Sequence, residues 1–385
     1  MTLEDFNQTK QKSNQQTKQQ IKQQTEQQTK QQKEKQQKEK QQILETFDPG
    51  GVGLDNGNIF GFPFTYETSD VIVFSVPWEV TVSFHSGTAK GPQAVLTASK
   101  QLDFYDYDYP DGWKQGIFML PAPGWIQQAN ETLRPVADKV VAASERRAEP
   151  ESIPGIEEAL AEVNEGCERM NDWVREAVGR AIAQSKKPAI LGGDHSVPFG
   201  ALQALAQTHD NFGILHIDAH CDLREAYQGF AFSHASIMHN ALKLPQISKL
   251  VQVGIRDVSH QEIATAEASE KRVVIYLDAQ LKRERYAGAT WHSLCEPIVS
   301  QLPPKVYISF DIDGLDPKLC PTTGTPVPGG LELEEAFYLL REVANRREII
   351  GFDVCEIGPD EWGANVAARI VYKLCNLMAL SIERA

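Results

Sequence analysis

The sequence predicts an α/β protein in which a parallel sheet is covered by helices on both faces. Short apolar runs bounded by polar turns have the pattern of buried strands, and they alternate with segments in which apolar residues recur at helical spacing. Carboxylate and imidazole side chains follow several of these runs directly. In such sheets ligands bind beyond the carboxyl ends of the strands, so these polar residues are the candidates for function.

The predicted strands are short apolar runs spread along the chain after residue 70. In chain order they are Val71–Val76, Ala189–Leu191, Gly213–Asp218, Leu250–Ile255, Val273–Leu277, Val306–Asp311 and Ile349–Val354. The clearest predicted helix is Ile156–Gln184, where apolar residues recur every three or four positions.

The composition excludes several classes of protein. The chain has 385 residues, of which 41% are hydrophobic and 23% charged, so it can bury a large core. No apolar run approaches the ~20 residues of a membrane span, and the N-terminus lacks the apolar stretch of a secretory signal. We therefore expect a cytoplasmic protein. Its six cysteines are scattered without a C-x-x-C pair, which argues against disulfides and a thiolate zinc site.

Residues 1–42 form a low-complexity, Gln/Lys-rich extension, and residues 43–385 are predicted to form one catalytic domain. The extension has too few apolar side chains to offset the entropy of ordering, so we expect a flexible or frayed segment. It carries nine Lys against five acidic residues, a net charge of +4. Since the whole chain has a net charge of −14, the remaining residues carry −18. So acidic a body excludes non-specific binding to nucleic acid.

The run Gly213–Asp218 leads into a cluster of metal-type ligands. Asp218, His220 and Asp222 occupy alternate positions, which places their side chains on one side of an extended chain. On a straight strand they would span roughly 13 Å at ~3.3 Å per residue, too far for one ion. Either the chain curls at the strand end or two ions are held.

Three other predicted strands end in similar groups. Asp311 and Asp313 close one run, His195 follows Gly192-Gly193-Asp194 after another, and Glu356 follows a third. Each motif alone is typical of a turn or a helix cap. Together they bring four carboxylates to one edge of the sheet. These carboxylates would repel one another unless cations neutralised them. Two divalent ions would balance the four charges.

These motifs resemble the signatures of the ureohydrolase (arginase/agmatinase) family. The matching segments, in order, are Gly-Gly-Asp-His-Ser, Asp-Ala-His-Cys-Asp and Ser-Phe-Asp-Ile-Asp-Gly-Leu-Asp-Pro, followed by Gly324-Thr325-Pro326 and Gly329-Gly330-Leu331. The resemblance covers most of residues 60–385. It implies a three-layer α/β/α arginase-like fold with an eight-stranded, mostly parallel sheet, and assembly as a homotrimer or homohexamer.

The resemblance also implies a ligand set for two divalent metal ions. One ion would be held by His195, Asp218, Asp222 and Asp311, and the other by His220, Asp218, Asp311 and Asp313. Asp218 and Asp311 would bridge the ions, so the three alternate residues need not share one of them. Water held between two cations is a strong nucleophile near neutral pH, and its attack on a guanidinium carbon releases urea.

The remaining catalytic roles also follow from the resemblance. His234, in Ser233-His234-Ala235, would protonate the leaving nitrogen, Glu356 would pair with the guanidinium, and Asp222 would accept the proton of the nucleophile. Thr97 and His239 are further predicted substrate-binding residues. His216 is in phase with the ligands but lies deeper in its strand, where a hydrogen-bonded structural role is favoured.

Departures from the family pattern bear on the substrate. Ala89 and Leu96 stand where arginines are common, Ala235 replaces a glycine, and we expect the apolar Phe232 and Met238 near the rim of the pocket. These changes favour a compact cation without a tail. The chain is thereby most similar to the nickel-dependent guanidine hydrolase branch, which implies free guanidine as substrate, Ni²⁺ delivered by accessory proteins, and urea and ammonia as products.

Other readings stay open. One is an agmatinase that yields putrescine and urea, or another guanidino-acid hydrolase, with Mn²⁺ as the alternative metal. The other is a non-catalytic metal-binding or scaffold member of the same fold, in which the polar N-terminal extension would carry the function.

Overall fold

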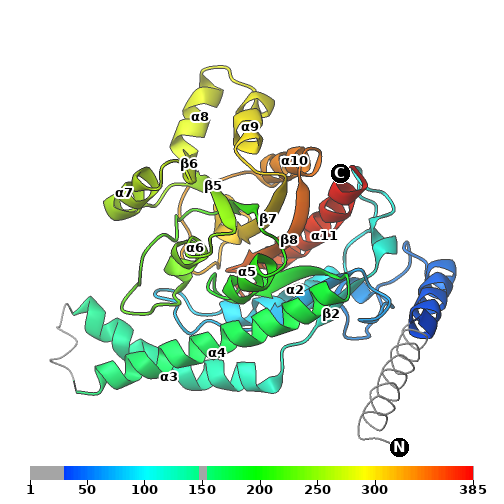
Figure 1. Ribbon diagram of the computed structural model, residues 1–385, viewed down its shortest axis with the longest axis horizontal. Helices are drawn as coiled ribbons and strands as arrows, with labels where there is room; N and C mark the ends of the chain where they lie inside the picture. The colour runs from blue at the N-terminus through cyan, green and yellow to red at the C-terminus, as the bar shows by residue number, and fades with distance from the viewer. Residues whose placement is uncertain (1–29, 147–153, 385) are drawn as a thin grey trace, which may run out of the picture.

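The computed structural model describes residues 30–146 and 154–384, and these form a single eight-stranded sheet between two layers of helices (Figure 1). Every pair of neighbouring strands is parallel. The strand order is β2-β1-β3-β8-β7-β4-β5-β6. The strands are β1 Val71–Val76, β2 Ile117–Leu120, β3 Lys187–Gly192, β4 Phe212–Ile217, β5 Ile247–Ile255, β6 Val273–Leu277, β7 Lys305–Asp311 and β8 Glu348–Cys355.

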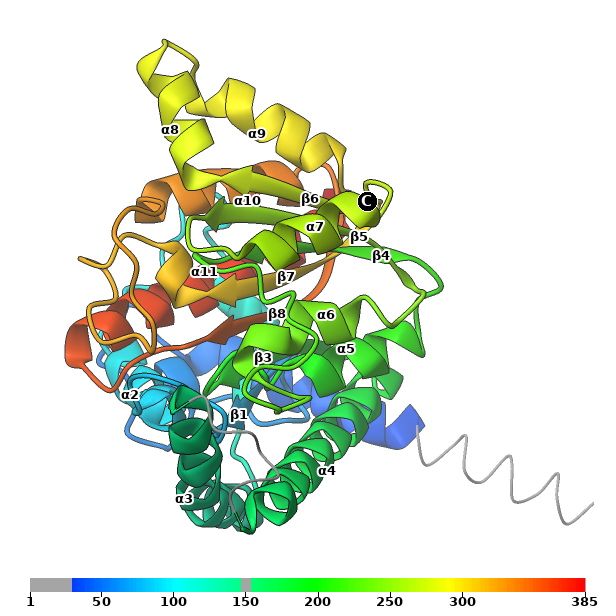
Figure 2. The same ribbon diagram turned by 90° about the vertical axis from the view of Figure 1, so that its left-hand side faces the viewer.

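The helices are divided between the two faces of the sheet, as Figure 2 shows. The buried core on one face includes residues of α2, α9, α10 and α11, and the cores on the other face include residues of α3, α4, α5, α6 and α7. The helices are α2 Gly91–Ser99, α3 Gly124–Glu145, α4 Ile156–Ala183, α5 Phe199–Ala206, α6 Ile237–Ala241, α7 His260–Ala268, α8 Asp278–Tyr286, α9 Trp291–Ser300, α10 Leu333–Ala344 and α11 Glu361–Arg384.

The predicted fold class is confirmed, with all the strand pairs parallel. Each predicted strand is present, and β1 and β6 have the predicted bounds. The sequence prediction missed β2, a strand of four residues at the edge of the sheet that pairs only with β1. So short an apolar run carries little periodic signal, and its pairing partner lies far away in the sequence.

Residues 30–46 are helical, and the predicted domain boundary between residues 42 and 43 lies inside this helix. The Lys40 ammonium lies 2.8 Å from Asp70 Oδ2 and donates a hydrogen bond to the carbonyl of Gln115. Ile43, Leu44 and Phe47 then pack against the core that includes residues of α2 and α11. The prediction for residues 1–29 lies outside the residues that the structure describes.

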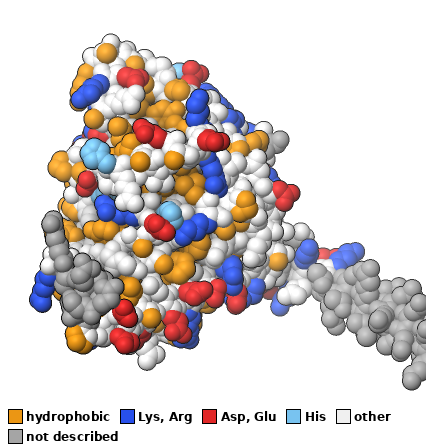
Figure 3. Space-filling model, turned by 60° about the vertical axis from the view of Figure 1, so that its left-hand side comes forward, with side chains coloured by type: hydrophobic (Ala, Val, Ile, Leu, Met, Phe, Trp, Pro, Cys, Tyr) orange, Lys and Arg blue, Asp and Glu red, His pale blue; other side chains and the backbone are white. Residues whose placement is uncertain are grey.

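Charged side chains of both signs lie on the surface. On the face seen in Figure 3, acidic and basic side chains alternate with apolar ones, and no large field of one sign stands out. Among residues 30–146 and 154–384, no helix is long and apolar enough to cross a bilayer.

Candidate metal centre and active site

The predicted ligands meet at the carboxyl ends of four strands that are neighbours in the sheet. In the order β3-β8-β7-β4, His195 follows β3, Glu356 follows β8, Asp311 ends β7 and Asp218 follows β4. Because these strands run parallel, their carboxyl ends lie side by side. Topology thus assembles the site from segments that are far apart in the sequence.

The first group of ligands surrounds His195. Its Nδ1 lies 3.1 Å from Asp218 Oδ2, 3.3 Å from Asp222 Oδ2 and 3.2 Å from Asp311 Oδ2. The other ring nitrogen, Nε2, lies 2.9 Å from Ser309 Oγ and 3.4 Å from Asp353 Oδ1. Nε2 is thus held by the scaffold while Nδ1 faces the carboxylates. Such an anchoring contact is usual for a histidine that binds a metal.

The second group lies on the other side of Asp218. His220 Nδ1 is 3.1 Å from Asp313 Oδ2 and 3.4 Å from Asp218 Oδ1. Asp313 Oδ1 accepts a hydrogen bond from the backbone of Ala219, at 3.0 Å. Its Oδ2 is buried and accepts no hydrogen bond from the described residues. A buried carboxylate oxygen without a donor is costly unless a cation binds there.

The geometry answers the spacing problem of Asp218, His220 and Asp222. After β4 the chain turns, and Asp222 has a left-handed φ of 54°. Asp222 therefore joins the His195 group, whereas His220 joins the Asp313 group, and the carboxylate of Asp218 lies between them. The structure brings all six predicted ligands together in this arrangement.

The electrostatics of the centre favour cations. Burial, together with the charges of Asp313 and Asp218, raises the pKa of Asp311 well above its usual range. Burial and the charge of Asp218 raise the pKa of Asp222 to about 6. Both pKa shifts arise because carboxylates are buried close to one another, and bound divalent ions would stabilise their charged forms. Imidazole and carboxylate donors with one open oxygen therefore fit the pair of ions that the sequence predicts.

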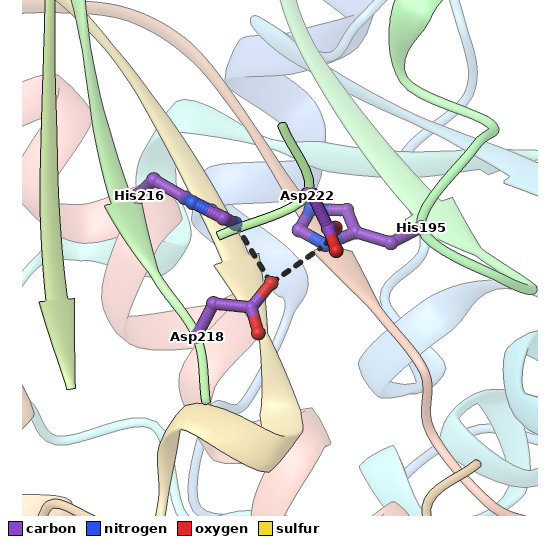
Figure 4. Close-up of side chains that lie close together, drawn as sticks. All are labelled: His195, His216, Asp218 and Asp222. Carbon is purple, nitrogen blue, oxygen red and sulfur yellow. Dashed lines mark hydrogen bonds and ion pairs between the residues drawn. The ribbon is translucent and has the colours of Figure 1, made fainter. Parts of the chain in front are cut away.

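His216 also lies beside the first group, as Figure 4 shows. Its Nε2 is 2.8 Å from Asp218 Oδ2, and its donor atoms lie close enough to those of His195, Asp218 and Asp222 to share an ion. Cys221 is buried in the core that includes residues of α5, α6 and α7. Burial raises the pKa of its thiol, in agreement with a packing role.

Glu356 presents one free oxygen beside the metal centre. Its Oε1 accepts a hydrogen bond of 2.8 Å from the backbone of His195, whereas its buried Oε2 has no hydrogen-bond partner in the described part of the chain. Burial and the charge of Asp194 raise the pKa of this carboxyl well above its usual range. A side chain at Gly324 would put its Cβ 2.8 Å from Oε2, so glycine avoids a clash with that oxygen.

His234 lines the same cavity. Its backbone donates a hydrogen bond to Thr81 Oγ1, and its ring meets the edge of Tyr227 with the centroids 6.0 Å apart. Burial, and then the charge of His220, lowers the pKa of His234 to about 3. The imidazole is therefore neutral near neutral pH and can take up or pass on a proton.

The cavity above the centre has a volume of about 250 Å³. The predicted residues that line it are His195, His220, Asp222, His234, Asp311 and Glu356. Its further wall residues, which the sequence analysis did not single out as site residues, include Ser83, Phe84, Arg224, Tyr227, Asp257, Glu262, Thr325, Pro326 and Val327. Arg224 and Tyr227 directly follow the second signature motif, so their position could have marked them. The others come from separate loops and, for Glu262, from the first turn of α7, which meet only in the folded chain.

Two predicted substrate residues lie elsewhere. Thr97 is exposed on α2, where its hydroxyl donates a hydrogen bond to the carbonyl of Gln93, and it does not line the cavity. His239 lies half-buried on α6 and also does not line it, although its backbone donates to the carbonyl of Asp222. Neither side chain lines the cavity in this structure, and both roles stay predictions.

The expected apolar rim is corrected. Phe232 and Met238 pack into the core around α5 and α6, and Leu96 packs on the opposite face of the sheet. None of the three lines the cavity. The aromatic wall comes instead from Phe84 and Tyr227.

Comparisons with known proteins agree with this geometry. A model described as "Arginase family" matches residues 69–376. An N(1)-aminopropylagmatine ureohydrolase of Thermus thermophilus is 32% identical over 327 residues, which cover 84% of this chain and 95% of the relative. An agmatinase of Halalkalibacterium halodurans is 26% identical over 299 residues, covering 76% and 86%.

Solved structures have the same fold. The agmatine ureohydrolase of Thermoplasma volcanium aligns with a TM-score of 0.65 at 22% identity and covers 89% of this chain and 99% of its own. The proclavaminate amidino hydrolase of Streptomyces clavuligerus also gives 0.65 at 22% identity, with 86% and 100% covered.

Proposed function

This chain belongs to the arginase family of metal-dependent hydrolases that act on guanidino compounds, and on that premise we propose that it hydrolyses free guanidine to urea and ammonia. When bound, two divalent ions supply the Lewis acidity that makes a water molecule strongly nucleophilic near neutral pH. His195, Asp222, His220 and Asp313 would hold the ions, with Asp218 and Asp311 shared between them.

The chain's own side chains bind the substrate and move the protons. Glu356 Oε2, which is buried and unpartnered among the described residues, accepts the N–H groups of a planar guanidinium. Its partner oxygen Oε1 is fixed by the backbone of His195, so the plane of the carboxylate is set. Asp222 would take the proton of the nucleophile. The neutral imidazole of His234 would act as a relay, accepting a proton at one ring nitrogen while the other releases its proton to the leaving nitrogen, so that the proton lost by water ends on ammonia.

The position of Arg224 in the cavity wall is the observation that favours a small substrate. Its guanidinium lies over the ring of Tyr227, 4.7 Å from the centroid, and forms part of the cavity wall. The distal ammonium of agmatine would meet this positive charge. The neighbouring carboxylate of Glu262 is already committed, because it accepts hydrogen bonds from the backbones of Leu223 and Ser259 and from the Ser259 hydroxyl. A compact guanidinium has no distal ammonium, so it is not repelled by Arg224 in this way and needs no pairing with Glu262.

Agmatine is the second candidate, favoured by the names of the relatives and by one wall residue. The Thermus thermophilus relative is named for an agmatine derivative. In this chain the exposed carboxylate of Asp257 also lines the cavity, where it could attract a distal ammonium.

We further propose Ni²⁺ as the resident metal, with Mn²⁺ as the alternative, and a homotrimer or homohexamer as the assembly. The ligands support either ion, because imidazole and carboxylate donors suit both and selection depends on geometry and delivery. Nickel-delivery accessory proteins are the corresponding partners.

The test compares metals and substrates in one protein. Metal-free protein is loaded separately with Ni²⁺ or Mn²⁺, and urea release is measured with guanidine, agmatine, guanidinobutyrate, guanidinopropionate and arginine. We expect the highest kcat/KM for guanidine with Ni²⁺. A far higher kcat/KM for agmatine with Mn²⁺ would select the second candidate, and metal-loaded protein that releases no urea from any compound would support the non-catalytic reading.

A further inference from the structure

His216 and Gln252 are buried polar side chains behind the metal centre, and the proposed chemistry gives neither of them a role. They lie on the neighbouring strands β4 and β5, where they are register partners. Both side chains are buried completely, as is Asp218. Polar side chains placed so deeply need hydrogen-bond partners, so their contacts decide what they do.

The orientation of the Gln252 amide follows from its two contacts. Its Nε2 lies 2.7 Å from the carbonyl oxygen of Cys221 and 2.9 Å from His216 Nδ1. A carbonyl oxygen can only accept, so the amide group that faces it must be the NH₂. The opposite orientation would set two acceptor oxygens against each other. The present one leaves Oε1 of Gln252 without a hydrogen-bond partner among the described residues. The two hydrogen bonds that Nε2 donates offset the cost of that buried oxygen.

That orientation fixes the tautomer of His216. Since the Gln252 amide donates to Nδ1, this nitrogen carries the lone pair and the ring proton sits on Nε2. Nε2 lies 2.8 Å from Asp218 Oδ2 and donates to it. Had Nε2 been a metal ligand, Nδ1 would have to carry the proton and would point at the NH₂ of Gln252. His216 is therefore excluded from the ligand set, although its nitrogen lies close enough to share an ion with the first group.

We propose that Gln252 and His216 form a positioning relay that orients the Asp218 carboxylate for binding two ions. The carbonyl of Cys221 aligns Gln252, Gln252 sets the His216 tautomer, and His216 donates to Oδ2 of Asp218. The other oxygen, Oδ1, accepts from the backbone of His220. Oδ2 of Asp218 then faces the His195 group, as Figure 4 shows, and Oδ1 faces His220 at 3.4 Å.

This inference rests on the proposed function only in taking Asp218 as a metal ligand. Outer hydrogen bonds of this kind typically contribute 10- to 100-fold to metal affinity. The relay therefore predicts an effect on metal binding that is separate from turnover. It also predicts a difference between two substitutions at the same position, depending on whether a donor remains at the place of Nε2.

The first measurement reads the tautomer directly. In protein labelled with ¹⁵N-histidine and loaded with diamagnetic Zn²⁺, two-bond ¹H–¹⁵N correlation spectra are compared with those of His216→Gln to assign the ring. We expect a neutral imidazole protonated at Nε2. In Gln252→Leu the ring loses its Nδ1 donor, and we expect this single-tautomer pattern to weaken. An Nδ1-protonated ring, or a doubly protonated one, in the unmodified protein would overturn the proposal.

The second measurement is the affinity for Ni²⁺, determined by calorimetric titration. His216→Met, which keeps the volume and loses the donor, should weaken binding about 10- to 100-fold, whereas His216→Gln, whose amide reaches the place of Nε2, should change it less than fivefold. Ser248→Ala, at the exposed beginning of β5, is the matched control. Unchanged affinity in His216→Met would overturn the relay. Correct tautomer and affinities in a protein that releases no urea would leave the relay standing and reject the proposed function.

Discussion

The guanidinium of Arg224 stacks on the ring of Tyr227 at a distance of 4.7 Å, and the edge of that ring in turn meets the ring of His234. The pair thus connects a positive charge in the cavity wall with the residue proposed to protonate the leaving group. Because Arg224 lines the cavity, a substrate with a positively charged tail would bind close to a like charge.

Arg224→Ala should improve activity on agmatine relative to guanidine. Repulsion between two like charges near solvent costs about 1 kcal/mol, so we expect roughly a fivefold rise in the ratio of kcat/KM for agmatine to that for guanidine. The matched control is Arg169→Ala, which removes a similar stack on Trp125 away from the cavity. An unchanged ratio in Arg224→Ala would mean that Arg224 does not discriminate.

Asp313→Asn should remove one of the two ions. Asp313 Oδ2 faces His220 at 3.1 Å and has no hydrogen-bond donor among the described residues, so an amide in its place lacks the charge that the second ion requires. We expect bound metal to fall from about two equivalents to one and turnover to fall at least 100-fold, because both ions activate the nucleophile. Metal content by atomic emission and urea release provide the measurements. Asp316→Asn on the same loop should keep both values.

Metal affinity should depend on pH through Asp222. The pKa of this carboxyl is raised to about 6, so a proton competes with the cation below that pH and no longer competes above it. From this group alone, affinity for Ni²⁺ should be about tenfold lower at pH 5 than at pH 7. Asp222→Asn should bind more weakly and show a shallower pH dependence. An equally steep dependence in the variant would assign the proton to another group, such as Asp311.

The sequence predicted which side chains meet at this edge of the sheet, because the candidate ligands follow strand ends at short, regular spacings. Asp218, His220 and Asp222 needed only the phase of one strand, and parallel pairing brought the other strand ends beside them. The curl that separates His220 from Asp222 was one of two alternatives, and the sequence could not decide for it, because it depends on a left-handed backbone at Asp222 that the residue type does not require.

The wall of the cavity was less predictable. Phe84 and Val327 reach it from loops whose paths depend on tertiary contacts, and Glu262 reaches it from the first turn of α7. No local pattern marks these residues as part of a cavity wall. Thr97 does not line the cavity because Val95 and Ser99 set the buried face of α2 and leave Thr97 on the exposed side, so its role in substrate binding stays a prediction. A motif places a residue near a site in sequence, whereas helical phase decides where its side chain points.

The largest loss of stability outside the metal centre should come from Lys373. Its ammonium is nearly buried in α11 and lies 2.8 Å from Asp106 and 2.6 Å from Asp108, so it fastens the loop before β2 to the last helix. Lys373→Met keeps the aliphatic stem and leaves two carboxylates close together without this cation. Removing one partner from a buried ionic cluster typically costs 3–5 kcal/mol. We expect about 3 kcal/mol, since Arg341 remains 3.5 Å from Asp108 and offsets part of its charge.

The measurement is urea unfolding at fixed metal and protein concentrations, because bound metal and assembly both shift apparent stability. Lys114→Met is the control, since its pair with Asp111 is exposed and should contribute less than about 1 kcal/mol. Adding Asp106→Asn to Lys373→Met should recover part of the loss, because the amide removes one of the uncompensated charges. If Lys373→Met costs no more than the control, the two carboxylates must be stabilised without the ammonium, and the cluster would not be what holds the loop to α11.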